Sequence, residues 1–282
     1  GPATPRNESG VGWHCEKVSA GCTNCYAETI NERRFGTGLA YTRPNRDRVD
    51  IYLDESTLTQ PLRWRKPRRV FVCSMTDLFG EWVTDAMLDR VFAVMALSPN
   101  ITYQVLTKRP ERMRRYLTAG RRPVALEAAT RALYAPLEEF SRDWRRHLAV
   151  MMTLEGSSAP NAYWPLPNVW LGVSVEDQPH ADKRIPELLA TPAAVRFLSC
   201  EPLLGPVDFA RITSAHAGAD YMNPLHGCYW RDGEMPDQVA ACASLDWVIV
   251  GGESGAQARP CDIAWIRSIV AQCKAAGVAV FC

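Results

Sequence analysis

The stretch "VWLGVSV" (residues 169–175) is short, almost continuously apolar, and rich in β-branched and aromatic residues. A run of this kind is typical of a parallel β-strand that is buried on both faces. Five other runs share this character: "RVFVCSM" (69–75), "TYQVLT" (102–107), "VRFLSC" (195–200), "DWVIVGG" (246–252) and "VAVF" (278–281). We therefore expect a sheet of parallel strands.

Helical patterns lie between these runs, at residues 85–98, 110–117, 180–191 and 262–277. Strands that alternate with helices indicate right-handed βαβ units. With one more strand near the N-terminus, we expect an α/β fold, a partial (β/α) TIM-type barrel of about six to seven parallel strands. No GxGxxG or Walker sequence follows any strand, which argues against a nucleotide-binding doubly wound sheet.

The barrel is expected to form a single domain over residues 1–282, with two insertions that are too long for plain crossovers. Residues 118–165 carry a helical pattern and are interpreted as a helical insertion. Residues 208–244 are rich in Gly, Tyr, Trp and His and are interpreted as a long loop or lid. This loop also holds four residues that offer metal-binding side chains, although an ordinary loop is the favoured interpretation: His216, His226, Cys228 and Cys242.

The composition excludes several classes of protein. Apolar residues make up 47% of the 282 residues, which excludes global disorder. The net charge of +1 provides no strong field for attracting nucleic acid to the protein as a whole. No apolar run approaches 18 residues and no secretory signal pattern is present, so we expect no membrane association. Ten cysteines without such a signal favour a reducing, cytoplasmic location.

Polar residues follow the predicted strands at the point where each strand ends. In a parallel barrel the carboxyl ends of the strands meet at one mouth, where active sites lie. We therefore expect a polar pocket there, although each residue can also simply cap the helix that follows. The candidate residues are Ser74, Thr76, Asp77, Lys108, Ser174, Glu201, Gly251, Gly252 and Glu253.

Three cysteines occur close together in "WHCEKVSAGCTNCYAE" (13–28): Cys15, Cys22 and Cys25, with the spacing C-x6-C-x2-C. A structural zinc ion usually takes four protein ligands, so zinc would need a distant fourth ligand. A [4Fe–4S] cluster held by three thiolates keeps one iron open for a substrate or cofactor. The residues leave an iron–sulfur cluster, a zinc site and structural thiols as alternatives, in that order.

Six segments together resemble the phage Gp37/Gp68-like family, a domain of unknown function (DUF5131). They are "KVSAGCTNCYAE", "RWRKPRRVFVCSMTDLF", "LTKRPERM", "NVWLGVSVEDQ", "RFLSCEPLLGPVD" and "DWVIVGGESGAQARP", in order from about residue 13 to the C-terminus. That family looks like a divergent branch of the radical S-adenosylmethionine (SAM) superfamily, with some likeness to spore photoproduct lyase.

The resemblance implies a radical SAM enzyme in which Cys15, Cys22 and Cys25 bind a [4Fe–4S] cluster on a loop after the first strand. The open iron chelates SAM, and one electron cleaves SAM to methionine and a 5′-deoxyadenosyl radical that abstracts a substrate hydrogen. Several of the other candidate residues match places where the superfamily contacts SAM: Ser74, Thr76 and Asp77 its amino group, Ser174 and Glu201 its ribose or carboxylate, and "GGESG" (251–255) adenine or substrate. The superfamily's usual spacing is C-x3-C-x2-C, so the first gap is longer here.

Such an enzyme needs an electron-donor protein, in a bacterial or phage-infected bacterial cell. Basic stretches at 43–48, 63–69, 108–115 and 142–146 indicate a nucleobase or nucleic-acid substrate if they share one face, and are otherwise solvated surface. Trp64, Tyr221, Tyr229 and Trp230 are candidates for stacking on bases. Two alternatives remain: a zinc- or iron–sulfur-stabilised nucleic-acid-binding protein without catalysis, and a metal-dependent barrel hydrolase that uses Asp77, Glu201 and Glu253.

Overall fold

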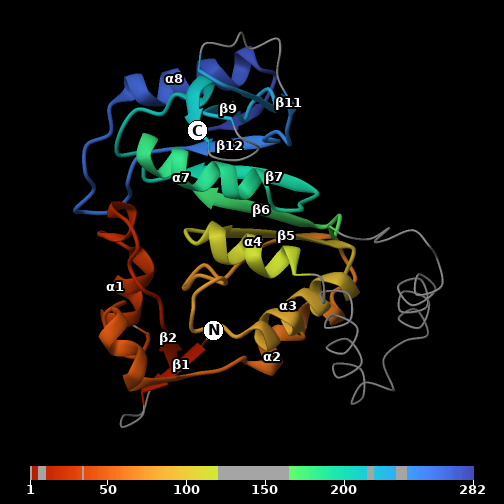
Figure 1. Ribbon diagram of the computed structural model, residues 1–282. Helices are drawn as coiled ribbons and strands as arrows, with labels where there is room; N and C mark the ends of the chain where they lie inside the picture. The colour runs from red at the N-terminus through yellow and green to blue at the C-terminus, as the bar shows by residue number, and fades with distance from the viewer. Residues whose placement is uncertain (1, 6–10, 34, 120–164, 215–218, 233–239) are drawn as a thin grey trace, which may run out of the picture.

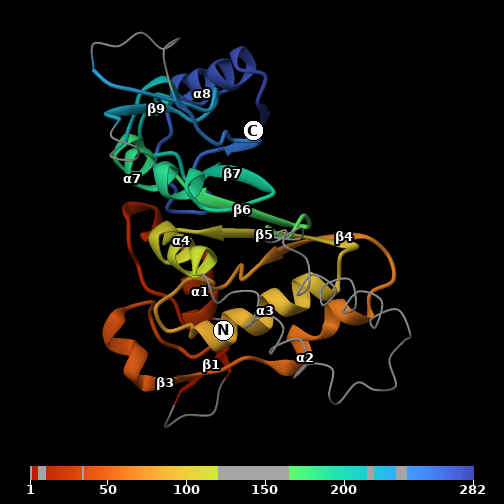
Figure 2. The ribbon, with the colours of Figure 1, turned by 45° about the vertical axis from the view of Figure 1, so that its right-hand side comes forward.

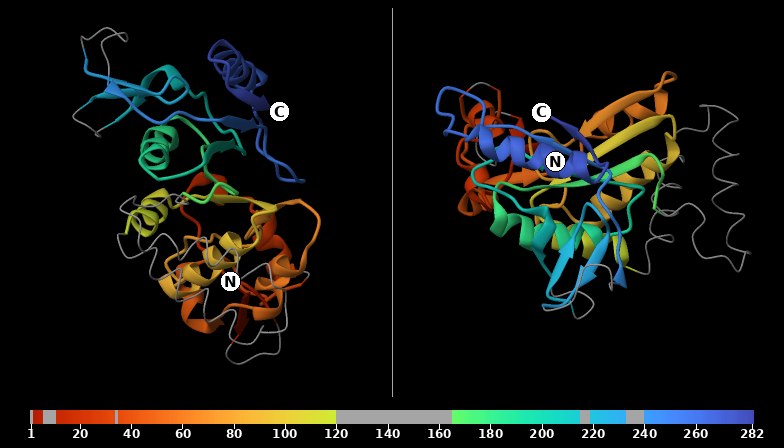
Figure 3. Two further views of the ribbon diagram at one scale, coloured as in Figure 1. Left: turned by 90° about the vertical axis from the view of Figure 1, so that its right-hand side faces the viewer. Right: turned by 90° about the horizontal axis from the view of Figure 1, so that it is seen from above.

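The computed structural model describes residues 2–5, 11–33, 35–119, 165–214, 219–232 and 240–282. Its main sheet has six parallel strands: β4 (Arg68–Val72), β5 (Ile101–Thr107), β6 (Val169–Ser174), β7 (Val195–Cys200), β12 (Trp247–Val250) and β13 (Ala279–Phe281). Their order in the sheet is their order in the chain, so each strand pairs with the one before it. The sheet curls into a half-barrel (Figures 1 and 3), in agreement with a partial (β/α) barrel.

Four helices follow strands of this sheet: α3 (Asp85–Leu97), α4 (Pro110–Thr118), α7 (Gln178–Leu189) and α8 (Ile263–Ala275). They match the helices predicted from the sequence. Three of these helices begin just after a capping residue. The side-chain oxygen of that residue accepts a hydrogen bond from a backbone N–H of the first turn that would otherwise be unpaired. The caps are Thr84, Asp177 and Asp262.

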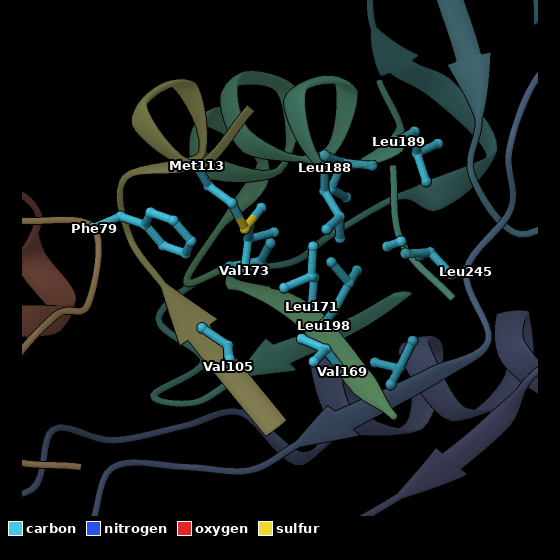
Figure 4. Packing of buried hydrophobic residues seen from close by; sticks show 14 of the residues in the cluster. Phe79, Val105, Met113, Val169, Leu171, Val173, Leu188, Leu189, Leu198 and Leu245 are labelled. Carbon is cyan, nitrogen blue, oxygen red and sulfur yellow. The ribbon is translucent and has the colours of Figure 1, made fainter. Parts of the chain in front are cut away.

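The hydrophobic core lies between the outer face of the sheet and these helices. Figure 4 shows Leu171 and Val173 of β6 beside Val105 of β5 and beneath Leu188 of α7. Burial on both faces holds for most of β6 and β7. The expectation is wrong for the edge strands β4 and β13, whose residues are exposed or only half-buried, because the sheet does not close.

The N-terminal strand does not join the half-barrel. β2 (Gly12–Trp13) pairs antiparallel with β1 (Pro2–Pro5), which also pairs with β3 (Val49–Ile51) in a separate small sheet. The prediction of a seventh barrel strand near the N-terminus is therefore wrong for the described residues, because β1 and β2 pair antiparallel within this separate sheet. Short helical elements complete this region: η1 (Ala20–Cys22), α1 (Tyr26–Arg33), η2 (Arg43–Arg48), α2 (Glu55–Leu58) and η3 (Gln60–Arg63).

The segment 208–244 contains more regular structure than the predicted loop. It comprises η4 (Phe209–Arg211), β8 (Ile212–Thr213), β9 (Tyr221–Asn223), β10 (Cys228–Trp230) and β11 (Ala240–Ala241). The strands form an antiparallel sheet in the order β11-β10-β9-β8. In Figure 2, β9 lies beside α8 and away from α1.

Two contacts dock η4 and the small sheet on the outer helices. The Thr213 amide donates to Asp182 of α7 at 3.1 Å, and the Phe209 amide donates to Gln272 of α8 at 2.7 Å. The segment thus occupies the place of a crossover helix between β7 and β12. The predicted helical insertion at 118–165 lies, for residues 120–164, outside the described residues.

Candidate functional site

A cavity of about 470 Å³ opens at the carboxyl ends of the half-barrel strands. In Figure 1 the N-terminal segment with α1 lies on the side of the sheet to which the β6 arrow points. The cavity lies between that segment and the strand ends. It is lined by every residue predicted for the site except Gly251: Cys15, Cys22, Cys25, Ser74, Thr76, Asp77, Lys108, Ser174, Glu201, Gly252 and Glu253.

Gly251 serves a packing role at the edge of the cavity. A Cβ atom at this position would lie 2.5 Å from Oε1 of Glu201, closer than any normal contact. The glycine therefore leaves room for the Glu201 carboxylate. None of the described residues of the segment 208–244 lines the cavity, and its role as a lid stays a prediction.

Two buried contacts fasten the cysteine-bearing loop to the strand ends. Ser19 donates a 2.7 Å hydrogen bond to Glu176, which follows β6, is fully buried, and also accepts from Arg184 at 2.8 Å. A Cβ on Gly21 would lie 2.4 Å from the same carboxylate. The loop therefore rests directly on Glu176, a strand-end residue that the sequence analysis left out of the candidate site.

A second carboxylate holds the other side of the loop. Glu253, which follows β12, accepts hydrogen bonds from Asn24 at 2.9 Å and from the Arg259 guanidinium at 2.6 Å. Arg259 in turn donates to the carbonyl of Ala20 at 3.0 Å. The hydrogen bonds from Arg259 lower the pKa of Glu253 to about 2. Glu253 is therefore an ionised anchor for the cysteine loop, and Asn24 and Arg259 join the site as residues that sequence patterns did not reveal.

Asp77 is also fully engaged with neighbouring residues. Its carboxylate accepts hydrogen bonds from the Phe79 amide, the Thr107 hydroxyl, the Lys108 amide and the Arg109 guanidinium, at 2.7 to 3.1 Å. The Thr76 hydroxyl next to it donates to the carbonyl of His14. These two side chains hold the first two strand ends and the start of the cysteine segment together, so little of either remains for a ligand.

Comparison with known proteins gives one match. The family model described as "Protein of unknown function (DUF5131)" covers residues 10–282. This chain belongs to the DUF5131 family. The family membership expected from the six sequence segments is thereby confirmed. No curated protein and no solved structure matches the chain.

In this DUF5131 protein the groups that remain open to a ligand lie on three different strand ends. Lys108 donates to the Ser174 hydroxyl at 3.0 Å and lies 3.7 Å from Glu176. Glu201 makes no hydrogen bond or ion pair with the described residues, and burial raises the pKa of its carboxyl group. Ser74 is exposed, and its carbonyl accepts a hydrogen bond from the hydroxyl of Tyr26 at 2.6 Å.

The thiols of the DUF5131 site surround the cavity. Cys22 belongs to η1, and Cys25 immediately precedes α1, whose Thr29 amide donates to the Cys25 carbonyl. Burial and the charge of Asp77 raise the pKa of the Cys15 thiol to about 12. A fourth thiol, Cys73, also lies at the cavity wall, with a left-handed backbone (φ 59°).

The arrangement of these donors bears on which metal group fits. Zinc ligands converge on one ion at about 2.3 Å for each sulfur, so their atoms lie close together. Within the described ranges, no three or more His, Cys, Asp or Glu side chains lie close enough to hold one ion. The thiolates of an iron–sulfur cluster bind separate irons and stand further apart. Cys15, Cys22 and Cys25 line one cavity, but in the described part of the chain they do not converge on a single ion.

No helix in the described part of the chain is long and apolar enough to cross a membrane.

Proposed function

We propose that this DUF5131 protein is a radical SAM enzyme in which Cys15, Cys22 and Cys25 hold a [4Fe–4S] cluster. One observation carries the proposal: the three thiols and the polar ends of five parallel strands line the same cavity. When bound, the cluster supplies the electron that cleaves SAM to methionine and the 5′-deoxyadenosyl radical. The resemblance of the six sequence segments to a radical SAM-like family points the same way.

The open groups of the cavity match the charges of SAM. Lys108 offers a cation for the SAM carboxylate, and Ser174, which already accepts from Lys108, orients that ammonium group. Glu201 offers an unengaged carboxylate to an ammonium group or a ribose hydroxyl. The cavity volume of about 470 Å³ lies within the roughly 300–1,000 Å³ of small-molecule sites.

The other candidate residues take positioning roles in this proposal. Asp77 and Thr76 fix the strand ends, while Glu176 and Glu253 fix the cysteine loop from two sides. Gly252 and Ser74 both line the cavity, where Gly252 has no side chain to fill the space and Ser74 offers a hydroxyl. In this proposal the protein residues hold the thiols in fixed positions and orient SAM next to them.

The proposal also sets the environment in which the protein works. A one-electron reaction needs an electron-donor protein, and free thiols need a reducing compartment. We therefore propose a location in the cytoplasm of a bacterial or phage-infected bacterial cell.

The two alternative functions find less support in the geometry. A hydrolase metal would need Asp77, Glu201 and Glu253 together, yet Asp77 and Glu253 are each committed to an arginine at 3.1 and 2.6 Å. A single zinc ion would need converging ligands, which the described residues do not provide.

Anaerobic reconstitution with iron and sulfide, followed by reduction with SAM, tests the proposal without knowledge of the substrate. We expect a brown protein that absorbs near 400 nm and releases 5′-deoxyadenosine. Cys22→Ala should abolish both properties, whereas Cys228→Ala, which changes a thiol on β10 outside the cavity, should retain both. A colourless protein with stoichiometric zinc would contradict the proposal.

A further inference from the structure

The segment 63–69, "RWRKPRR", concentrates positive charge at the amino end of β4. Five of its seven residues are cations, and all five are exposed: Arg63, Arg65, Lys66, Arg68 and Arg69. No acidic residue occurs between Glu55 and Asp77, and none occurs in the neighbouring strand β5. Arg65, Lys66 and Arg69 therefore have no acidic neighbour nearby along the chain or in the adjacent strand.

The segment is held in a defined conformation. The guanidinium of Arg68 lies 4.5 Å from the centroid of the Trp64 ring, and Asn100 donates to the Trp64 carbonyl at 3.1 Å. These contacts use Arg68 and Trp64, and they leave the side chains of Arg65, Lys66 and Arg69 exposed. The segment therefore presents cations from an ordered backbone.

The strand register connects this segment to the cavity. Arg69 pairs with Thr102 and Phe71 with Gln104, so Arg69 and Phe71 lie on the same face of β4, about 7 Å apart along the strand. Phe71 lines the cavity, although 47% of its surface is exposed. Basic and aromatic side chains thus follow one another along an edge strand that ends at the proposed reaction site.

We infer that the segment 63–69 and the inner face of β4 bind a single-stranded nucleic acid and bring one base against Phe71 at the cavity. For its catalytic meaning, this inference rests on the proposed function. Proteins bind single-stranded nucleic acid with cations that follow the phosphates and with aromatic rings that stack on the bases. A base inside a duplex would first have to leave its stack to reach the cavity.

The aromatic residues of β9 and β10 are less suited to this role. Tyr221 and Trp230 pack against each other with ring centroids 6.0 Å apart, on the small sheet outside the cavity. The guanidinium of Arg211 covers the Tyr221 ring at 4.1 Å. The nucleic-acid contact therefore belongs at Phe71 rather than at these residues.

A fluorescein-labelled 15-residue oligodeoxythymidylate, titrated by fluorescence anisotropy at several salt concentrations without SAM, tests the inference on the reconstituted protein. Arg65→Glu with Lys66→Glu should weaken binding and reduce the salt slope by about 1.4, because two phosphate contacts are lost. Arg267→Glu with Lys274→Glu makes the same charge change on the exposed surface of α8 and should alter neither quantity.

Phe71→Ala should weaken oligonucleotide binding roughly five- to a hundredfold through the loss of stacking, whereas Phe71→Trp should retain it. Inorganic polyphosphate has no bases, so it should not sense the Phe71 ring. In competition with the labelled oligonucleotide, its own dissociation constant should be the same for both Phe71 variants. Two results would overturn the inference: equal effects of the two double reversals, and unchanged oligonucleotide binding by Phe71→Ala.

An electron-donor protein with an acidic surface is the other partner that this basic segment could bind. If the double reversal at Arg65 and Lys66 slows reduction of the cluster but leaves oligonucleotide binding intact, the segment is a donor-docking surface and the inference is wrong. Because binding is measured without SAM, its result is independent of 5′-deoxyadenosine formation. Failure of the reaction and failure of the nucleic-acid contact therefore give different results.

Discussion

The hydroxyl of Ser19 donates a 2.7 Å hydrogen bond to the fully buried carboxylate of Glu176, 157 residues further along the chain. The same carboxylate pairs with Arg184, whose side chain is only 3% exposed. The cysteine loop therefore rests on a buried ion pair at the end of β6. Breaking the Glu176–Arg184 pair should therefore lower the stability of the fold and shift the position of the thiols.

Glu176→Ala is expected to lower the free energy of unfolding by about 3–5 kcal/mol, because it leaves the buried Arg184 charge with the Ser174 carbonyl but without its carboxylate partner. Ser19→Ala removes the hydrogen bond to the charged Glu176 and a long contact with the Cys22 thiol, and should cost about 1.5–3 kcal/mol. Urea denaturation measures both values. Ser268→Ala, at an exposed position on α8, is the control and should change stability by less than about 0.5 kcal/mol. The Ser19 variant should also retain less iron after reconstitution; undiminished iron would show that the loop does not depend on this contact.

Glu253→Gln should give a stability difference that depends on pH. The folded pKa of about 2 lies below the unfolded value of 4.5, so the ionised form is favoured in the folded protein. The stabilisation is fully present above about pH 4.5 and is lost as pH falls through about 2. Thermal melts should therefore show a lower melting temperature for the variant at pH 7 and convergence with the wild type near pH 2. Glu32→Gln, at an exposed position on α1, should show no such trend.

Glu201→Gln should change the melting temperature in the opposite direction to Glu253→Gln. Burial raises the pKa of this carboxyl group above 4.5, so the folded protein disfavours its ionised form. The variant should melt at an equal or higher temperature than the wild type at pH 8 and converge with it near pH 4. Equilibrium dialysis of the reconstituted protein should show weaker SAM binding. A variant that is destabilised at pH 8 would indicate that Glu201 is a structural partner rather than a ligand group.

The part of the fold that follows from local pattern was predictable. The six apolar runs became the six strands, and their carboxyl ends lie at one edge because parallel strands share a direction. For this reason residues as distant in sequence as Ser74 and Glu253 were brought to one cavity. The family resemblance added the grouping of the three cysteines with those strand ends.

Other parts depend on tertiary contacts that leave no periodic trace. The strands β2, β8 and β11 have two residues each, too few to show an alternation. The choice of Ser19 and Asn24 as the partners of buried carboxylates spans 157 and 229 residues. Spacing along the chain also cannot show that Asp77 uses its carboxylate on protein donors, since that depends on where β5 places Thr107 and Arg109.

Asp77 could act either as a positioning residue or as a SAM ligand, and two substitutions distinguish these roles. Asp77→Ala should lower the free energy of unfolding by about 3–5 kcal/mol, because it leaves the Arg109 guanidinium and two backbone amides without their acceptor. Asp85→Ala breaks an Asp–Arg pair of the same type with Arg112, but Asp85 is 59% exposed, so the cost should stay within about 1 kcal/mol. Urea denaturation compares the two variants. If Asp77 binds SAM directly, Asp77→Asn will keep wild-type stability and lose SAM affinity. If Asp77 instead positions the strand ends, Asp77→Asn will lower both the free energy of unfolding and the SAM affinity.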